Sequence, residues 1–159
     1  MGLPVHILVS HFVVVLIPLS AMATIAVALR KDWRDKYAAP LAAGNVAMLA
    51  LTFVTMRAGQ DLKDRYRGLG DVKTPKFSHE KLGMTLVWIM VALAVVSLAI
   101  WALQPLRAVA PAAVLGLAGV VALLATSSIV FAVLAGHTGA ESHWKEFVQN
   151  SDKQLSKQH

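Results

Sequence analysis

The chain has 159 residues, of which 57% are hydrophobic and only 15% are charged, and its mean hydropathy is +0.60. This composition is too apolar for an ordinary soluble domain, and the absence of cysteine excludes disulfides, thiolate ligands and c-type haem attachment. The formal net charge of +6 lies outside the apolar blocks, as expected for membrane topology and anionic headgroups, and nucleic acid is not an expected partner.

Four apolar blocks without Asp, Glu, Lys or Arg predict four transmembrane helices, at about 3–29, 37–56, 82–103 and 110–135. Each block reaches the ~20 residues that a helix needs to cross ~30 Å of hydrocarbon. We therefore predict an all-α, polytopic membrane protein, an antiparallel four-transmembrane-helix bundle. Residues 1–135 would form this domain, and 136–159 a polar, partly amphipathic tail. The first block is not expected to be a signal peptide, because basic residues follow it instead of a small-residue cleavage site.

Polar residues and prolines interrupt the first two predicted helices. Pro18 predicts a kink in the first helix, and Pro40 is expected in the first turn of the second, where proline costs little. The second helix also contains Asn45, Thr52 and Thr55. These side chains would bond to neighbouring helices or back to their own backbone, and a packing role is favoured over a functional one.

The longest loop, residues 57–81, contains apolar residues at helical spacing, which predicts a short helix on the membrane surface: Leu62, Tyr66 and Leu69. Thr74 followed by proline resembles a helix start, so the third helix is expected to begin before the bilayer and to include His79.

The fourth predicted helix contains a triplet, Thr126, Ser127 and Ser128, that is expected to face the bundle, because unpaired hydroxyls are unfavourable in hydrocarbon. In the tail, apolar residues on one helical face predict a second interfacial helix: Trp144, Phe147 and Val148.

All six histidines belong to one side of the predicted bundle: His6, His11, His79, His137, His143 and His159. His11 falls at the expected edge of the hydrocarbon, His79 lies three residues before Leu82, and His137 follows the fourth block. We expect His11 to point into the bundle, because lipid is the costlier alternative. His6 lies about 140° around the helix from His11, which favours a headgroup contact or a supporting role.

Imidazoles delivered by different helices to one depth would suit the axial positions of a b-type haem. They would equally suit a divalent metal or copper ion, and the candidate ligands are His6, His11, His79 and His137. The alternative is that these histidines are structural and bond to carbonyls or headgroups.

Four motifs resemble one family: LPVHILVSHFVVVLIPL, MRAGQDL, SHEKLGMTLV and GHTGAESHW. The chain resembles the four-helix bacterial membrane family of unknown function 2231, closest to its actinobacterial-type branch. The matching polar positions are His6, His11, Gly59, His79, Gly83, Gly136 and Gly139. The resemblance favours His11 with His79 over His137 as ligands. Fusion of family members to c-type cytochrome or Rieske-type modules implies a redox setting.

The leading hypothesis is therefore a small membrane protein that binds haem b or a metal and transfers electrons within a larger assembly, as a carrier rather than a stand-alone enzyme. The alternative is a non-catalytic accessory subunit with structural histidines. A transporter is disfavoured, because the predicted helix interiors contain no acidic or basic residue. The expected partners are the lipid bilayer and other membrane subunits, with a homo-oligomer as a further possibility.

The orientation signals disagree. Ten Lys or Arg lie on the histidine side and five on the other, but four of those five follow the first helix within seven residues. The first helix usually dominates. We therefore predict the bacterial inner membrane with both termini outside the cytoplasm.

Overall fold

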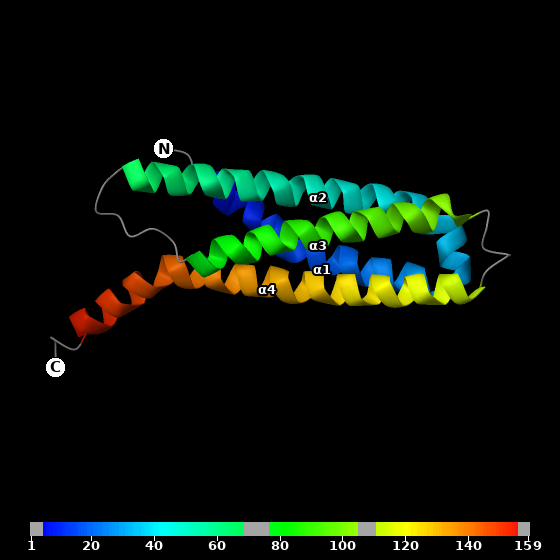
Figure 1. Cartoon of the computed structure of the whole chain (residues 1–159). Coiled ribbons are helices and arrows are strands. Elements are labelled where there is room, and N and C mark those ends of the chain that lie inside the picture. The colour runs from blue at the N-terminus through cyan, green and yellow to red at the C-terminus, as the bar shows by residue number, and fades with distance from the viewer. Residues whose placement is uncertain (1–4, 69–76, 105–110, 156–159) are drawn as a thin grey trace.

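A computed structural model shows one bundle of four long α-helices (Figure 1). It describes residues 5–68, 77–104 and 111–155, with side chains described within 9–65, 79–104 and 112–144. The helices are α1 (Val5–Leu29), α2 (Lys31–Gly68), α3 (Phe77–Ala102) and α4 (Pro111–Leu155). Neighbours in sequence pack side by side and α4 also packs on α1, so the antiparallel bundle closes on itself.

All four helices are long and apolar enough to cross a membrane, which confirms the predicted all-α, four-span architecture. The candidate spans are Val9–Leu29, Lys31–Arg65, His79–Ala102 and Gly116–Glu141. The division at residue 135 stays a prediction, because α4 continues through that position to Leu155.

The second helix differs from its prediction at both ends. It begins at Lys31, so Pro40 lies in its interior and not in its first turn. Figure 1 shows the first turns of α2 crossing the end of the bundle before the helix runs along it. The separate surface helix predicted around Leu62 is wrong, because α2 continues to Gly68. That segment is rich in good helix formers and has no proline to stop the helix. Leu69 and Thr74 lie outside the described residues.

The other helices bring smaller changes. α1 runs as one helix through Pro18, and its kink stays a prediction. α3 begins at Phe77, so His79 is helical as expected. Of the predicted triplet in α4, Ser128 is buried, whereas Thr126 is exposed and Ser127 is half-buried. The prediction that all three face the bundle is wrong, because three consecutive residues spread over about 200° of a helix.

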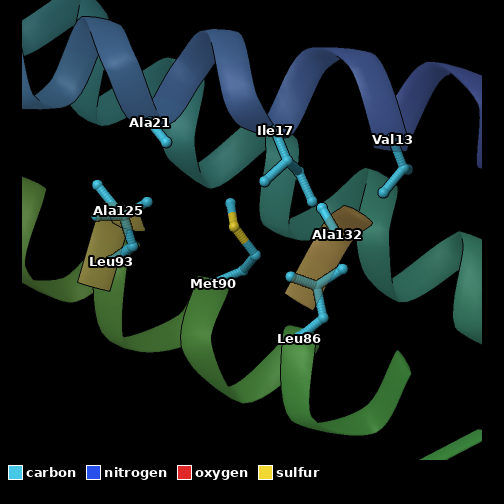
Figure 2. Packing of buried hydrophobic residues seen from close by; sticks show 8 residues of the cluster. All are labelled: Val13, Ile17, Ala21, Leu86, Met90, Leu93, Ala125 and Ala132. Carbon is cyan, nitrogen blue, oxygen red and sulfur yellow. The ribbon is translucent and has the colours of Figure 1, made fainter. Parts of the chain in front are cut away.

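The apolar core combines large side chains on α1 and α3 with small ones on α4. Its buried residues are Val13, Ile17, Ala21, Leu86, Met90, Leu93, Ala125 and Ala132. Figure 2 shows Met90 reaching from α3 toward α1, between Ala21 and Ile17. The alanines of α4 let its backbone approach the other helices closely, which is how helices pack where lipid is as apolar as the core.

A polar cluster around Asn45 joins three helices inside this core. The Asn45 side chain is fully buried on α2. Its Oδ1 accepts a hydrogen bond from Ser20 Oγ on α1 at 2.7 Å. Its Nδ2 donates to Thr24 Oγ1 on α1 at 3.1 Å and to Ser97 Oγ on α3 at 2.8 Å. We call these four residues the asparagine cluster.

The hydroxyl protons of the asparagine cluster also have acceptors. Thr24 donates to the Ser20 carbonyl and Ser97 to the Leu93 carbonyl, each at 2.7 Å. Both oxygens can therefore accept from Asn45 while their protons stay bonded to their own helices. Thr52 and Thr55 also donate back to carbonyls of their own helix, at 2.7 and 2.8 Å. The cluster fixes the rotation of α1, α2 and α3 against one another.

Candidate functional site at the histidine end

The histidine end is the end of the bundle where α1 and α3 begin and where α2 and α4 run toward Gly68 and Leu155. His79, in the first turn of α3, packs against α4. Its Nδ1 lies 3.2 Å from Thr138 Oγ1. The Thr138 hydroxyl itself donates to the carbonyls of Leu134, at 2.9 Å, and Ala135, at 3.2 Å. With its own proton directed at these carbonyls, the Thr138 oxygen has lone pairs that can accept a hydrogen bond from His79 Nδ1.

Two glycines let α4 approach its neighbours closely at this level. A Cβ atom on Gly139 would lie 3.1 Å from His79 Cε1, so the imidazole rests directly on the α4 backbone. A Cβ atom on Gly136 would lie 3.1 and 3.3 Å from the two methyl carbons of Val14 on α1. Both seams of α4, against α3 and against α1, are closed at the histidine end.

These contacts also set the depth of the histidines. His11 precedes Val14 by three residues, and Gly139 follows Gly136 by three residues on the antiparallel α4. At about 1.5 Å per residue, His11 and His79 lie at nearly one level. His137 is two residues before Gly139, so it lies within about 3 Å of the level of His11 and His79 along the bundle axis.

The three histidines at this level face different directions. His79 is half-buried between α3 and α4, whereas His11 and His137 are exposed. The expectation that His11 points into the bundle is wrong. Val13 and Ile17 occupy the inward positions of α1, and His11 lies roughly 160° and 120° around the helix from them. His6, His143 and His159 lie outside the described side chains.

Charged groups join α2 to α3 beside His79. Lys63 forms an ion pair with Glu80, and their side chains are 22% and 39% exposed. Two residues before Gly59, the Arg57 guanidinium lies 5.3 Å from the Phe53 ring. The ion pair joins Lys63, the residue directly after the motif MRAGQDL, to Glu80 of the motif SHEKLGMTLV at the histidine end.

Among the described residues, no three His, Asp or Glu side chains are placed to hold one metal ion. A bis-histidine haem needs two imidazoles on opposite faces of one macrocycle. His79 rests directly on Gly139, and His11 and His137 are exposed on other helices. A porphyrin therefore does not fit inside the single bundle, and the assignment of His11, His79 and His137 as ligands stays a prediction.

Sequence reasoning missed the partners of the polar residues. Thr138 follows His137 in the motif GHTGAESHW but was not identified as the partner of His79. Ser20, Thr24 and Ser97 were likewise not connected with Asn45. The available signal was the presence of isolated hydroxyl residues at similar depths in otherwise apolar helices.

Comparison with known proteins gives one match. A family model described as "Predicted membrane protein (DUF2231)" matches residues 2–152, nearly the whole chain. No curated protein and no solved structure matches the chain.

Proposed function

The chain belongs to this family of membrane proteins, and we propose that it works as a non-catalytic subunit that packs against another protein within the bilayer. The interior supports a scaffold role, because the asparagine cluster satisfies its own hydrogen bonds and the core around it is closely packed. The outer surface of α2 supports the packing role most directly.

The outward side of α2 is lined with alanine. Four exposed alanines recur at spacings of three or four residues, and we call them the alanine face: Ala39, Ala43, Ala47 and Ala50. Beside them, a Cβ atom on Gly44 would meet nothing within 4 Å. Over residues 39–50 the one large hydrophobic side chain that α2 exposes is Val46, with Phe53 and Val54 exposed beyond that stretch, whereas the outer sides of α1 and α3 expose large groups such as Phe12, Leu19 and Trp88. Small residues allow close approach of helix backbones in membranes, so the alanine face fits a partner helix better than lipid chains do.

Cysteine cross-linking in native membranes tests this proposal, because the chain has no cysteine of its own. Ala43→Cys and Ala47→Cys should each form an adduct, identified by mass spectrometry, with one membrane protein. Leu19→Cys and Val133→Cys, which replace exposed residues on α1 and α4, are the matched controls.

The outcomes separate the partner classes. Adducts confined to the alanine-face variants support a distinct partner subunit. An adduct between two copies would replace that proposal with a homo-oligomer. Equal cross-linking at all four positions, or none at any, would contradict a specific interface on α2.

A second candidate function is redox, and the geometry of His79 favours it. Metal-binding histidines usually hydrogen-bond their other ring nitrogen to an oxygen, and His79 Nδ1 lies 3.2 Å from Thr138 Oγ1. Nε2 is then the nitrogen that would bind a b-type haem, a divalent metal or copper. Since a porphyrin does not fit inside one bundle, such a group would lie at the surface and share a ligand with another chain. When bound, it would supply one-electron transfer; His11, His137 and His6 are the alternative ligands.

A visible spectrum and elemental analysis of the protein, purified with its native partners, test the redox candidate. A haem would give a Soret band with α and β bands on reduction, and His79→Ala should abolish it. His11→Ala tests the paired ligand. A colourless, metal-free assembly would contradict the redox candidate and leave the scaffold proposal standing.

We further propose that the protein resides in the bacterial inner membrane with both termini outside the cytoplasm. The support is the cluster of basic residues directly after α1. A C-terminal alkaline phosphatase fusion should be active and a green fluorescent protein fusion dark. The reverse result would place the histidine end in the cytoplasm.

A further inference from the structure

Two cations and two aromatic rings form a strip at the junction of α1 and α2 and along the first turns of α2. The Arg30 guanidinium lies 4.7 Å from the centre of the Trp33 ring. Trp33 meets Tyr37 edge to face, with centroids 6.2 Å apart. The Lys36 ammonium lies 5.2 Å from the Tyr37 ring. We call these four residues the basic strip, and all four are exposed.

The basic strip is held on a fixed corner of the bundle. Arg34, half-buried beneath it, donates to the carbonyl of Ala28 near the end of α1. Gln104, just after α3, donates from Nε2 to the Arg34 carbonyl at 2.7 Å. The last turn of α1 and the segment just after α3 are thus tied to the first turn of α2. The basic strip is a preformed surface rather than a set of independent side chains.

The strip lies at the level where a membrane changes from hydrocarbon to headgroups. The candidate span of α1 ends at Leu29, immediately before Arg30, and that of α3 ends at Ala102, just before Gln104. Aromatic rings with a polar edge favour this level, and basic residues here reach lipid phosphates. A guanidinium stacked on a ring still has N–H donors at its edge for a phosphate.

We propose that the basic strip binds the phosphate of an anionic phospholipid headgroup. Arg30 and Lys36 would bond the phosphate oxygens, while the Trp33 N–H and the Tyr37 hydroxyl would bond the glycerol and ester oxygens beneath. Residues 30–37 include four basic and two acidic side chains, and this excess of positive charge favours an anionic over a zwitterionic lipid.

The two acidic residues of the turn do not neutralise the strip. Asp35 lies roughly 160° around α2 from Trp33. Asp32 stands one turn before Lys36. Lys36 instead lies against Tyr37.

Native mass spectrometry of the full chain in detergent, with added phosphatidylglycerol or phosphatidylcholine, tests the proposal. The chain should retain phosphatidylglycerol in preference to phosphatidylcholine. The double variant Arg30→Gln with Lys36→Gln should bind phosphatidylglycerol about 25-fold more weakly, because each basic residue near an anionic surface contributes roughly fivefold. Inorganic phosphate at the same concentration should not compete.

The matched control is Arg57→Gln with Arg65→Gln, which removes the same charge from exposed residues at the opposite end of α2 and should change binding less than about twofold, because charges that far apart are screened. Equal losses in both double variants would show that net charge alone attracts the lipid, and would overturn the proposal. Unchanged binding in the strip variant, equal retention of both lipids, or competition by free phosphate would overturn it as well. Circular dichroism confirms that the variants stay helical.

Discussion

The asparagine cluster and the histidine end are two polar regions of an otherwise apolar bundle, and they are built differently. Asn45 makes three hydrogen bonds to two other helices, and the hydroxyls that accept from it donate to their own backbone. His79 makes its described cross-helix bond to a single hydroxyl, that of Thr138, beside a glycine. Asn45, Thr24 and Ser97 of the cluster are buried and Ser20 is half-buried, whereas two of the three histidines at the other region are exposed.

This difference separates groups that hold the fold from groups available to another molecule. A buried polar network with every partner present strengthens a core and has little capacity left for a ligand. His79, in contrast, is half-buried at the end of the bundle, where part of its imidazole lies at the surface. We therefore look for function on the ends and outer faces of the bundle.

The largest expected effect comes from Asn45→Ala. It removes three hydrogen bonds between helices and leaves a small cavity, so the free energy of unfolding should fall by about 2–4 kcal/mol. Unfolding followed by circular dichroism in a detergent titration measures it. Thr52→Val, which loses only a bond within α2, is the control and should cost under about 0.5 kcal/mol. Equal losses in both variants would remove the distinction between the cluster and ordinary hydroxyls.

The next effect concerns the close approach of α4 to α1. Gly136→Ala places a Cβ atom 3.1 Å from the Val14 side chain, which is stiff because it is branched at Cβ. In Gly119→Ala the added Cβ atom would meet nothing within 4 Å. Because alanine has the higher helix propensity, this variant should gain up to about 1 kcal/mol in the free energy of unfolding. We expect the two variants to differ in unfolding free energy by about 1–2 kcal/mol, with Gly136→Ala the less stable. A difference near zero would mean that the seam at the histidine end adapts readily.

A smaller effect tests the bond between His79 and Thr138. In a double-mutant cycle of His79→Ala and Thr138→Val, the coupling should be about 0.5–1.5 kcal/mol, as for a typical hydrogen bond. The same thermal or detergent unfolding measurement gives all four values. Additive losses, with no coupling, would show that the two side chains do not stabilise each other, and would also weaken the case for an oriented imidazole.

The smallest effect belongs to the ion pair between Lys63 and Glu80. Both side chains are partly exposed, so Glu80→Gln should cost no more than about 0.5 kcal/mol. Because salt screens such pairs, the difference from the unmodified chain should vanish near 1 M salt. A loss that is larger, or insensitive to salt, would indicate that this pair holds α2 and α3 together in the way Asn45 does.

The number and type of helices were predictable, because the length and composition of each apolar block are sufficient to identify a membrane span. The rotation of each helix was not. In α1, Ile17 is buried while the neighbouring Leu16 is 38% exposed, although the two side chains are chemically alike. Without a polar side to mark the outside, His11 was assigned the wrong direction. The extension of α2 to Gly68 was not predictable from charge, because the charged segment after residue 56 is as typical of a separate surface helix as of a continued one.

Of the candidate site, only the depth of the histidines along the bundle could be predicted from the sequence. Matching depths for His11 and His79 followed from counting residues along antiparallel helices. The contact between His79 and Thr138 requires both the rotation of α4 and the close approach that Gly139 permits, and neither is encoded in the local sequence pattern of one helix.

The asparagine cluster also bears on how the chain enters the membrane as it is synthesised. The ribosome makes α1 first, so Ser20 and Thr24 are already present when Asn45 of α2 leaves the ribosome. The amide can thus be satisfied within an inserting pair of helices, and the energetic cost of an isolated asparagine in lipid is avoided. Ser97 is synthesised later, and its hydroxyl donates to the Leu93 carbonyl of its own helix. Its proton therefore has an acceptor before α3 packs against α2. The order of the helices along the chain is the order in which their polar groups can be accommodated.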